Sequence, residues 1–454
     1  MIYTMKQLKA SLVIVVISIF FNPINVISVY DTDESRTIVD QEEVYYKYNL
    51  GLKYYRGIGG PQDKKKAALL FMIAAEQGLA EAQYNLGVMC HRGEGIAQDY
   101  KKAVEWYRKA VEQKYAPAQF NLGVLYSHGK GVRRDYSEAV KWYKKSAEQG
   151  YAAAQKKMGQ LYRDGEGVSQ DYHQAARWFR KAAGTGDELA QYMLGVMHYN
   201  GEGVVQDYNV AFDWYKKAGE QGHVRSQFEL GYMYYLGKGV SRDLPEGHKW
   251  ASKAAAQGYQ QAQSFLGYLY YSGEGVPQDF KEALKWSSRA AEQGCARAQN
   301  LIGTMYQAGE GVTQNFKEAV LWFRKAAERG NAEAQSNLGY MYYFGEGVPQ
   351  NFSEAHTWTS KAAEHGVAQA QYNLGLMYRY GEGVTQDYKR SFDCVRKAAE
   401  RGHLDAQYLL GEMLDTGDGV AQDNNEAARW YRRAAAGGHT KAQENLDKLY
   451  SKAP

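Results

Sequence analysis

Four consecutive residues, Ser127-His128-Gly129-Lys130, spell the Ser-x-x-Lys motif. In penicillin-recognising enzymes this motif supplies the serine that forms the acyl-enzyme. Those enzymes also carry Lys-Thr-Gly and Ser-Asp-Asn motifs, and neither triplet occurs in the 454 residues. The tetrad lies in a loop of a regular repeat that is described below. We therefore interpret it as part of that loop and predict no catalytic residue.

Other groups that could hold a ligand also lack the spacing that their chemistry needs. Eleven Gly-x-Gly loops suggest a phosphate cradle, but each follows a helical pattern and its central residue is usually Glu, which repels phosphate. The 10 His residues show no ligand spacing with Cys or acidic residues. The sequence therefore predicts no cofactor, no nucleotide and no metal site.

Composition excludes two further classes of protein. Lys and Arg number 55 against 51 Asp and Glu, so the net charge of +4 gives no reason to expect nucleic acid as a partner. The mean hydropathy of −0.61 excludes a protein with several membrane spans.

The first thirty residues differ in character from the rest of the chain. Lys6 and Lys9 precede an apolar or small run over residues 10–21, and Pro23 ends that run. This run is too short to cross a bilayer, which takes about 20 residues. It is typical of a secretory signal peptide, predicted here over residues 1–28. We expect an exported protein, periplasmic or secreted if the source is bacterial, with membrane contact only through an uncleaved signal segment.

A period of 36 residues organises the remainder of the chain. Its marker is a Gly that follows Leu, Met or Ile in each copy and recurs without insertion or deletion. The eleven marker residues are Gly51, Gly87, Gly123, Gly159, Gly195, Gly231, Gly267, Gly303, Gly339, Gly375 and Gly411. Because no linker can be placed inside such a run, we predict one array over residues 43–450. A polar leader over 29–42 precedes it, and a tail over 451–454 follows it.

Each copy has the pattern helix, loop, helix. In the second copy Ala82, Leu86 and Met89 recur at spacings of three and four, which is typical of one helical face. After the Gly-x-Gly loop, an Asp or Asn such as Asp99 stands at the capping position of the second helix in all eleven copies. The second helix ends at Gly in ten copies, with Lys114 as the exception. One such hairpin cannot bury both its faces, so neighbouring hairpins must stack.

These repeats resemble the Sel-one-like repeat family, helical-hairpin relatives of the tetratricopeptide repeat. The family's Ala-x-x-Trp, Lys-Ala-Ala-Glu-x-Gly, Ala-x-Ala-Gln, Leu-Gly and Gly-x-Gly-Val elements all occur within residues 319–348. The resemblance implies an all-α fold, an α-solenoid forming a right-handed superhelix of about eleven 36-residue helix-loop-helix repeats. It also implies a protein-interaction scaffold without shared catalytic residues. Some cysteine-rich members are described as β-lactamases, so a hydrolase of that type is the alternative function.

The nine Trp and three Cys residues have simple expected roles. Every Trp occupies the same repeat position. We predict that all nine are core residues and that Trp214→Ala costs about 3–5 kcal/mol of unfolding free energy. Cys90, Cys295 and Cys394 lie at least 99 residues apart. Hairpins that advance by about 8–10 Å keep such residues beyond the Cα separation of about 7 Å that a disulfide allows, which predicts three free thiols.

A partner is expected on the first helices, which line the concave surface of tetratricopeptide-like arrays. Positions −6, −3, +1, +4 and +5 from the marker Gly would point inward, and several copies carry Tyr, Phe or Arg there. Tyr and Arg are enriched at interface hot spots. The candidates are Tyr192, Tyr199, Arg225, Phe228, Tyr232, Tyr235, Tyr268, Tyr271, Tyr340, Tyr343, Tyr372 and Arg379.

This Tyr-rich face predicts a protein or peptide partner, bound as an extended or helical segment, with no nucleic acid and no small-molecule cofactor. The sequence leaves one alternative open at the candidate positions. About half of the Tyr rings could instead pack between neighbouring first helices, with only the hydroxyl in water.

Overall fold

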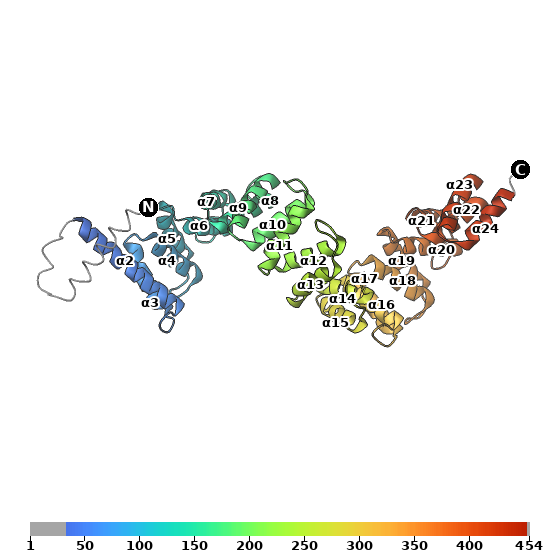
Figure 1. Cartoon of the computed structure of the whole chain (residues 1–454), viewed down its shortest axis with the longest axis horizontal. Helices are drawn as coiled ribbons and strands as arrows, with labels where there is room; N and C mark the ends of the chain where they lie inside the picture. Colours follow the sequence, from blue (N-terminus) through green and yellow to red (C-terminus); the bar gives the residue numbers. More distant parts are fainter. Residues whose placement is uncertain (1–32, 452–454) are drawn as a thin grey trace. The chain divides into compact units, whose positions relative to one another are not determined.

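The computed structural model describes residues 33–451, which contain 23 helices and no strand (Figure 1). The predicted signal peptide lies outside these residues. The chain divides into two compact units, the first ending at Gln206 and the second beginning at Asp207. Each unit is described by itself.

The first unit contains nine helices in the described residues. They are α2 (Asp33–Arg56), α3 (Lys64–Glu76), α4 (Ala80–Arg92), α5 (Tyr100–Glu112), α6 (Ala116–His128), α7 (Tyr136–Glu148), α8 (Ala152–Asp164), α9 (Tyr172–Gly184) and α10 (Glu188–Asn200). Helix α2 is longer than the others and begins at Asp33, so part of the predicted polar leader is helical.

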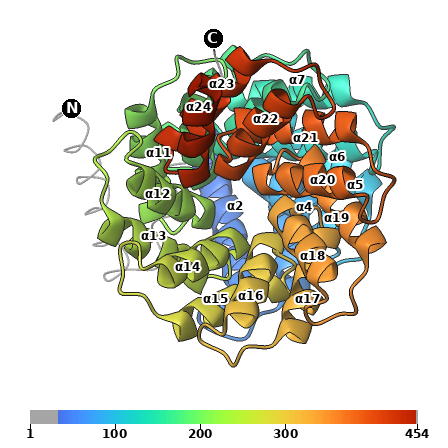
Figure 2. The same cartoon turned by 90° about the vertical axis from the view of Figure 1, so that its right-hand side faces the viewer.

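The second unit contains fourteen helices in the described residues. They are α11 (Tyr208–Glu220), α12 (Val224–Leu236), α13 (Leu244–Ala256), α14 (Gln260–Ser272), α15 (Phe280–Glu292), α16 (Ala296–Ala308), α17 (Phe316–Glu328), α18 (Ala332–Phe344), α19 (Phe352–Glu364), α20 (Ala368–Tyr380), α21 (Tyr388–Glu400), α22 (Leu404–Thr416), α23 (Asn424–Ala436) and α24 (Thr440–Ser451). Even-numbered helices up to α22 are first helices of hairpins and carry the marker Gly, and odd-numbered helices are second helices. Helix α24 has Asp447 at the marker position. The hairpins of this unit follow one another around a common axis (Figure 2). We number the repeats one to eleven by their marker Gly.

The predicted capping and closing residues bound the second helices as expected. Asp99 accepts hydrogen bonds from the backbone N–H groups of Lys101 and Lys102, and the other ten capping residues, from Asp63 to Asp423, accept equivalent bonds. Lys114 has φ of 61° and is the only non-glycine residue with positive φ in the described part of the chain. The predicted boundaries of the second helices are therefore confirmed, including the one irregular copy.

The main core position is the residue that follows the Trp, twenty residues after the marker Gly. It holds a buried aromatic ring in seven repeats: Phe71, Tyr107, Tyr143, Phe179, Tyr215, Phe323 and Tyr431. In the repeats of Phe71, Tyr107, Tyr143, Phe179, Phe323 and Tyr431 the marker residue has to be Gly because the ring lies directly on it. A Cβ atom added to Gly87, for example, would lie 2.6 Å from Cε1 of Tyr107.

The prediction that all nine Trp residues are core is wrong. Only Trp178, Trp250 and Trp430 are buried, and the other six are half-buried. Trp214 is one of the six, so the cost predicted for Trp214→Ala is too high. Every indole has the Lys or Arg three residues later over its ring, at 3.9–4.8 Å from the ring centroid. The residue after the Trp packs on the marker Gly, so the Trp itself lies at the edge of the second helix. There a cation–π contact covers its ring. The three Cys thiols are free, as predicted.

A Gln at one position ties most first helices to the hairpin before them. Gln83 donates from Nε2 to the carbonyl oxygen of Ala75 at 3.1 Å, and its Oε1 accepts from Gln113 at 3.0 Å. Gln113 ends the second helix of the same repeat. Repeat four has Thr185 at that end, and there Oε1 of Gln155 is buried without a hydrogen-bond partner. The stacking of hairpins thus depends on polar pairing as well as on apolar burial.

Candidate protein-binding site

The twelve candidate residues lie in both units. Tyr192 and Tyr199 are on α10 in the first unit, and the other ten are on α12, α14, α18 and α20 in the second. Helix α16 between them carries none, because Gln307 stands where its neighbours have Tyr. The candidates of each unit are therefore described separately.

Residues at position −3 pack between helices and do not face solvent freely. Tyr192 is buried, and Phe228 and Tyr372 are half-buried. Phe228 contacts Phe265 of the next first helix, with ring centroids 6.2 Å apart. Tyr372 stacks on His403 at 4.7 Å. For this position the packing alternative left open by the sequence is the correct one.

Residues at position +4 link consecutive repeats. The hydroxyl of Tyr343 donates a hydrogen bond to Glu382 in the Gly-x-Gly loop of the next repeat. Arg379 forms an ion pair of 3.1 Å with Asp418 at the equivalent place one repeat later. Position +4 therefore contributes to the array itself, and the loop acids that repel phosphate serve as acceptors for the repeat before them.

These links perturb the titration of the tyrosines. Burial, together with the neighbouring carboxylate, raises the pKa of Tyr343 to about 12, and the same causes raise the pKa of Tyr271 to about 12. For Tyr235 the neighbouring carboxylate of Glu274 is the larger cause of a raised pKa, followed by burial.

We expect the array to lose stability between pH 10 and pH 12. A folded-state pKa above the ordinary value of 10.0 means that the neutral phenol is favoured by folding. This contribution is complete below pH 10 and is lost as pH rises through the folded pKa. The urea midpoint of the wild-type chain should fall across this pH range. The midpoint of Tyr343→Phe should fall less steeply. Equal slopes for both chains would contradict the assignment.

Residues at positions +1 and +5 form the exposed part of the candidate set. Tyr232, Tyr268 and Tyr340 at +1 are 38–41% exposed. Position +5 adds the exposed side chains of Leu236, Phe344 and Tyr380, which the candidate set did not include. We call these six residues, five of which are aromatic, the exposed aromatic row. Arg225 is exposed at the start of α12, beside one end of the row.

A pocket of about 590 Å³ opens beside this row, between α16, α18, α19 and α20. Its polar lining consists of Gln307, Ser336, Asn337, Thr359, Gln369 and Asn373. Its apolar lining consists of Tyr340, Tyr343, Phe344, Leu376 and Met377, and marker Gly339 completes it. No charged side chain lines it. We call it the repeat-nine pocket.

Most of these lining residues were not among the candidates. Phe344 and Gln369 occupy positions +5 and −6, which were expected to point inward. The candidate set did not include these two residues. Ser336 and Thr359 were detectable as the small residues of repeat nine at positions where other repeats carry rings. Asn337 and Asn373 occupy position −2, which the helical pattern did not assign to this face.

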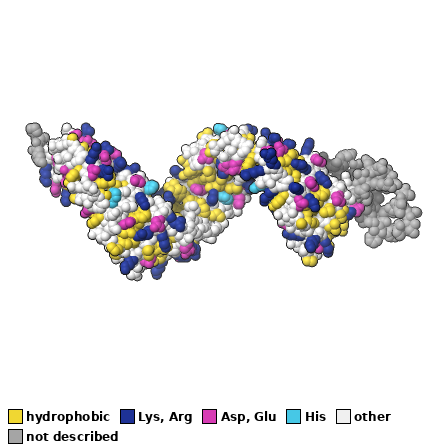
Figure 3. Space-filling model, turned by 180° about the vertical axis from the view of Figure 1, so that it is seen from behind, with side chains coloured by type: hydrophobic (Ala, Val, Ile, Leu, Met, Phe, Trp, Pro, Cys, Tyr) yellow, Lys and Arg dark blue, Asp and Glu magenta, His cyan; other side chains and the backbone are white. Residues whose placement is uncertain are grey.

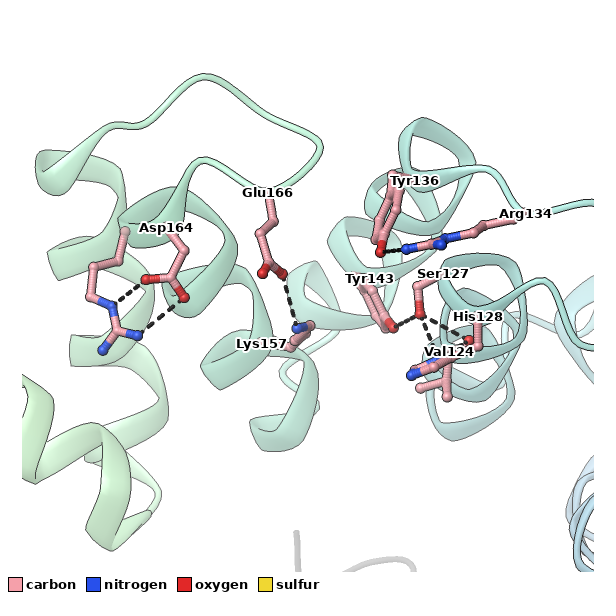
Figure 4. A network of polar contacts seen from close by, with 10 residues as sticks. Val124, Ser127, His128, Arg134, Tyr136, Tyr143, Lys157, Asp164 and Glu166 are labelled. Atoms are coloured by element: carbon pink, nitrogen blue, oxygen red, sulfur yellow. Dashed lines mark hydrogen bonds and ion pairs between the residues drawn. The ribbon is translucent and has the colours of Figure 1, made fainter.

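The Ser-x-x-Lys tetrad does not form a serine–lysine pair. The Ser127 hydroxyl is 2.9 Å from the carbonyl oxygen of Val124, 3.0 Å from Nδ1 of His128 and 3.3 Å from the Tyr143 hydroxyl (Figure 4). The amine of Lys130 instead lies over the Tyr100 ring, 5.1 Å from its centroid. This geometry gives Ser127 a structural environment in its hairpin.

Charge and metal-binding groups give no second site in the described residues. On the face that Figure 3 shows, basic and acidic side chains are interspersed. Within residues 33–451 no group of three or more His, Cys, Asp or Glu side chains is placed to hold a metal ion. In the same range no helix has the length and apolar character that a membrane span requires.

Comparison with known proteins gives one family. The Sel1 repeat model matches eleven times, at residues 45–79, 80–115, 116–151, 152–187, 189–223, 224–259, 260–295, 296–331, 332–367, 368–403 and 404–439. A comparison with curated proteins gives no match.

Two solved structures are similar over much of the chain. One is c5321, a protective antigen of uropathogenic Escherichia coli displaying an SLR fold, with 37% identity over 94% of this chain and 91% of that one and a TM-score of 0.85. The other is a Sel1 repeat protein from Oxalobacter formigenes, with 34% identity over 68% of this chain and 89% of that one and a TM-score of 0.56. The eleven family matches, the regular hairpins and this likeness agree, and the chain belongs to the Sel1 repeat family.

Proposed function

We propose that this protein is a non-enzymatic scaffold that binds a segment of a partner protein along the exposed aromatic row of its second unit. We further propose that it does so after export through the secretory pathway. Repeat scaffolds of this kind generally mediate protein–protein interaction. The observation that carries the proposal is the placement of the exposed rings.

Large exposed apolar side chains in the second unit gather on the first helices. The described part of the second unit has eight such residues, and six of them lie on first helices and form the exposed aromatic row. The two others, Leu321 and Tyr388, lie on second helices. Exposed apolar side chains gathered on one set of helices mark interaction sites, and Tyr offers a large contact area at a low entropic cost.

Two observations support export. The apolar run over residues 10–21 has the length and flanks of a signal peptide. The relative from uropathogenic Escherichia coli is described as a protective antigen, a role that fits a protein outside the cytoplasm. The periplasm and the external medium are both consistent with these observations.

The test starts by finding the partner in the source cells. A photo-crosslinking residue at position 268 of the full chain should attach one protein, whose affinity for the purified chain is then measured. The triple change Tyr232→Ser, Tyr268→Ser and Tyr340→Ser should weaken that affinity roughly a hundredfold, because hot-spot tyrosines typically contribute more than about 1 kcal/mol each.

The matched control is Leu321→Ser, which removes an apolar side chain of 51% exposure from second helix α17. Its affinity should equal that of the wild-type chain. All variants should keep the wild-type helical content, because none of the changed side chains fills the buried core. Full affinity in the triple variant would refute the exposed aromatic row as the binding surface.

A further inference from the structure

The repeat-nine pocket exists because two rings are missing from a regular pattern. In repeats one, two, three and eleven, the ring at −3 packs against the ring twenty residues after the marker Gly, with centroids 5.4–6.0 Å apart. In repeat nine these positions hold Ser336 and Thr359. Both line the pocket, and marker Gly339 lies between them on its wall.

The other repeats of the second unit that lack one or both rings differ from repeat nine. Repeats six and ten have Ala251 and Val395 twenty residues after the marker Gly but keep the ring at −3, as Phe228 and Tyr372. Repeat seven also has serines at both positions, but it carries Phe265 beside the first of them, and this ring lies 5.2 Å from that of Tyr235. Repeat eight lacks the ring at −3 but keeps Phe323. Repeat nine is therefore the place where this unit lacks ring volume that its neighbours possess.

The polar groups around the gap are placed for a ligand. Ser336 is 7% and Thr359 3% exposed, and both line the pocket. Asn373 accepts from Gln369 at 3.0 Å, and Asn337 donates to Asn300 at 3.1 Å. These bonds leave an amide donor on α20 and an amide acceptor on α18, the pair that an extended peptide main chain requires.

The chemistry of the walls selects the occupant. Without a charged group in the lining, a charged side chain would lose its hydration and gain no partner. A cavity of about 150 Å³ already accommodates benzene, so about 590 Å³ holds one aromatic side chain with its adjoining main chain. The gap also lies where the chain elsewhere places rings of its own.

We propose that the repeat-nine pocket receives a Phe or Tyr side chain of the partner segment, which occupies the place of the ring missing at Thr359. This inference rests on the proposed function and adds its specificity. The partner's ring packs against Gly339 and Met377, and its main chain pairs with Asn337 and Asn373. The exposed aromatic row then holds the residues that flank this ring.

The array offers its own way to close the pocket. Repeats four and eight carry Phe at the position of Thr359, together with a non-aromatic residue at −3. Thr359→Phe therefore gives repeat nine a combination that is compatible with the fold. Ser336→Tyr closes the pocket from α18 and serves as an independent variant. Thr359→Val keeps the pocket open and loses only the hydroxyl, which makes it the matched control.

The probe is a random dodecapeptide library displayed on phage, selected on the full chain and counter-selected on Thr359→Phe. Selected peptides should share a Phe or Tyr at one position. Replacing that residue by Ala, or testing the peptide on Thr359→Phe or Ser336→Tyr, should weaken binding at least about tenfold, in the range of a hot-spot contact. Thr359→Val should bind as the wild-type chain does.

Two outcomes overturn the inference and differ in what they say of the proposed function. Peptides that bind the two closed variants as tightly as the wild type, but lose binding to the triple Tyr→Ser variant, refute the pocket and leave the scaffold function standing. A library that gives no peptide sensitive to the closed variants or to the triple variant refutes both.

Discussion

Replacing Phe323 by Ala should lower the free energy of unfolding around repeat eight by about 3–5 kcal/mol. The Phe323 side chain is completely buried, and a Cβ atom on marker Gly303 would lie 2.6 Å from its Cδ1. The helices on both sides meet through this ring and cannot close the space that it leaves. The cost therefore includes a cavity as well as the lost burial.

The adjacent residue provides the control for this prediction. Trp322→Ala removes a larger side chain, but Trp322 is half-buried and carries Lys325 over its ring at 4.2 Å. We expect it to cost about 2 kcal/mol or less, because only part of its surface is removed from water by folding. Urea unfolding and hydrogen exchange of the α17 amides would measure both variants. A larger loss for Trp322→Ala than for Phe323→Ala would contradict the core that we describe.

Replacing Gly347 by Ala should destabilise the protein by about 2–5 kcal/mol. Gly347 has φ of +72°, and an added Cβ would lie 2.3 Å from the carbonyl oxygen of Phe316 at the start of α17. The loop of one repeat lies directly on the backbone of the preceding second helix at this point. Backbone atoms cannot yield as a flexible side chain can, so the clash adds to the strain of the left-handed conformation.

Gly330→Ala separates the two contributions to this effect. Gly330 has φ of +82°, but a Cβ atom there would meet nothing within 4 Å. Its cost should be about 1–2 kcal/mol, from backbone strain alone. Thermal melts of both variants measure the difference, and equal melting temperatures would show that the loop does not rest on α17.

The fold was predictable because each hairpin repeats the same local signals. Helix ends are predicted in every copy by the same capping residue, closing Gly and spacing of apolar side chains. Lys114 replaces the closing Gly in one copy and has the positive φ that this position requires. Family resemblance then supplied the stacking of hairpins. The handedness of the superhelix and the signal peptide stay predictions.

The core register and the pocket were not predictable in the same way. Trp322 and Phe323 are neighbours on one helix, and only the approach of marker Gly303 determines which of them the core receives. Candidate binding residues were sought where aromatic side chains are present. The repeat-nine pocket arises where they are missing, which becomes evident only when each copy is compared with the others position by position.

The constant repeat length also bears on how such a protein can evolve. Because no insertion interrupts the period, the hairpin backbone and its caps stay the same from copy to copy while side chains on the first helices differ. An exchange such as a ring for Thr359 changes what one copy can recognise without altering the frame that presents it. New partners can therefore be acquired one repeat at a time, while the inherited frame carries the cost of folding.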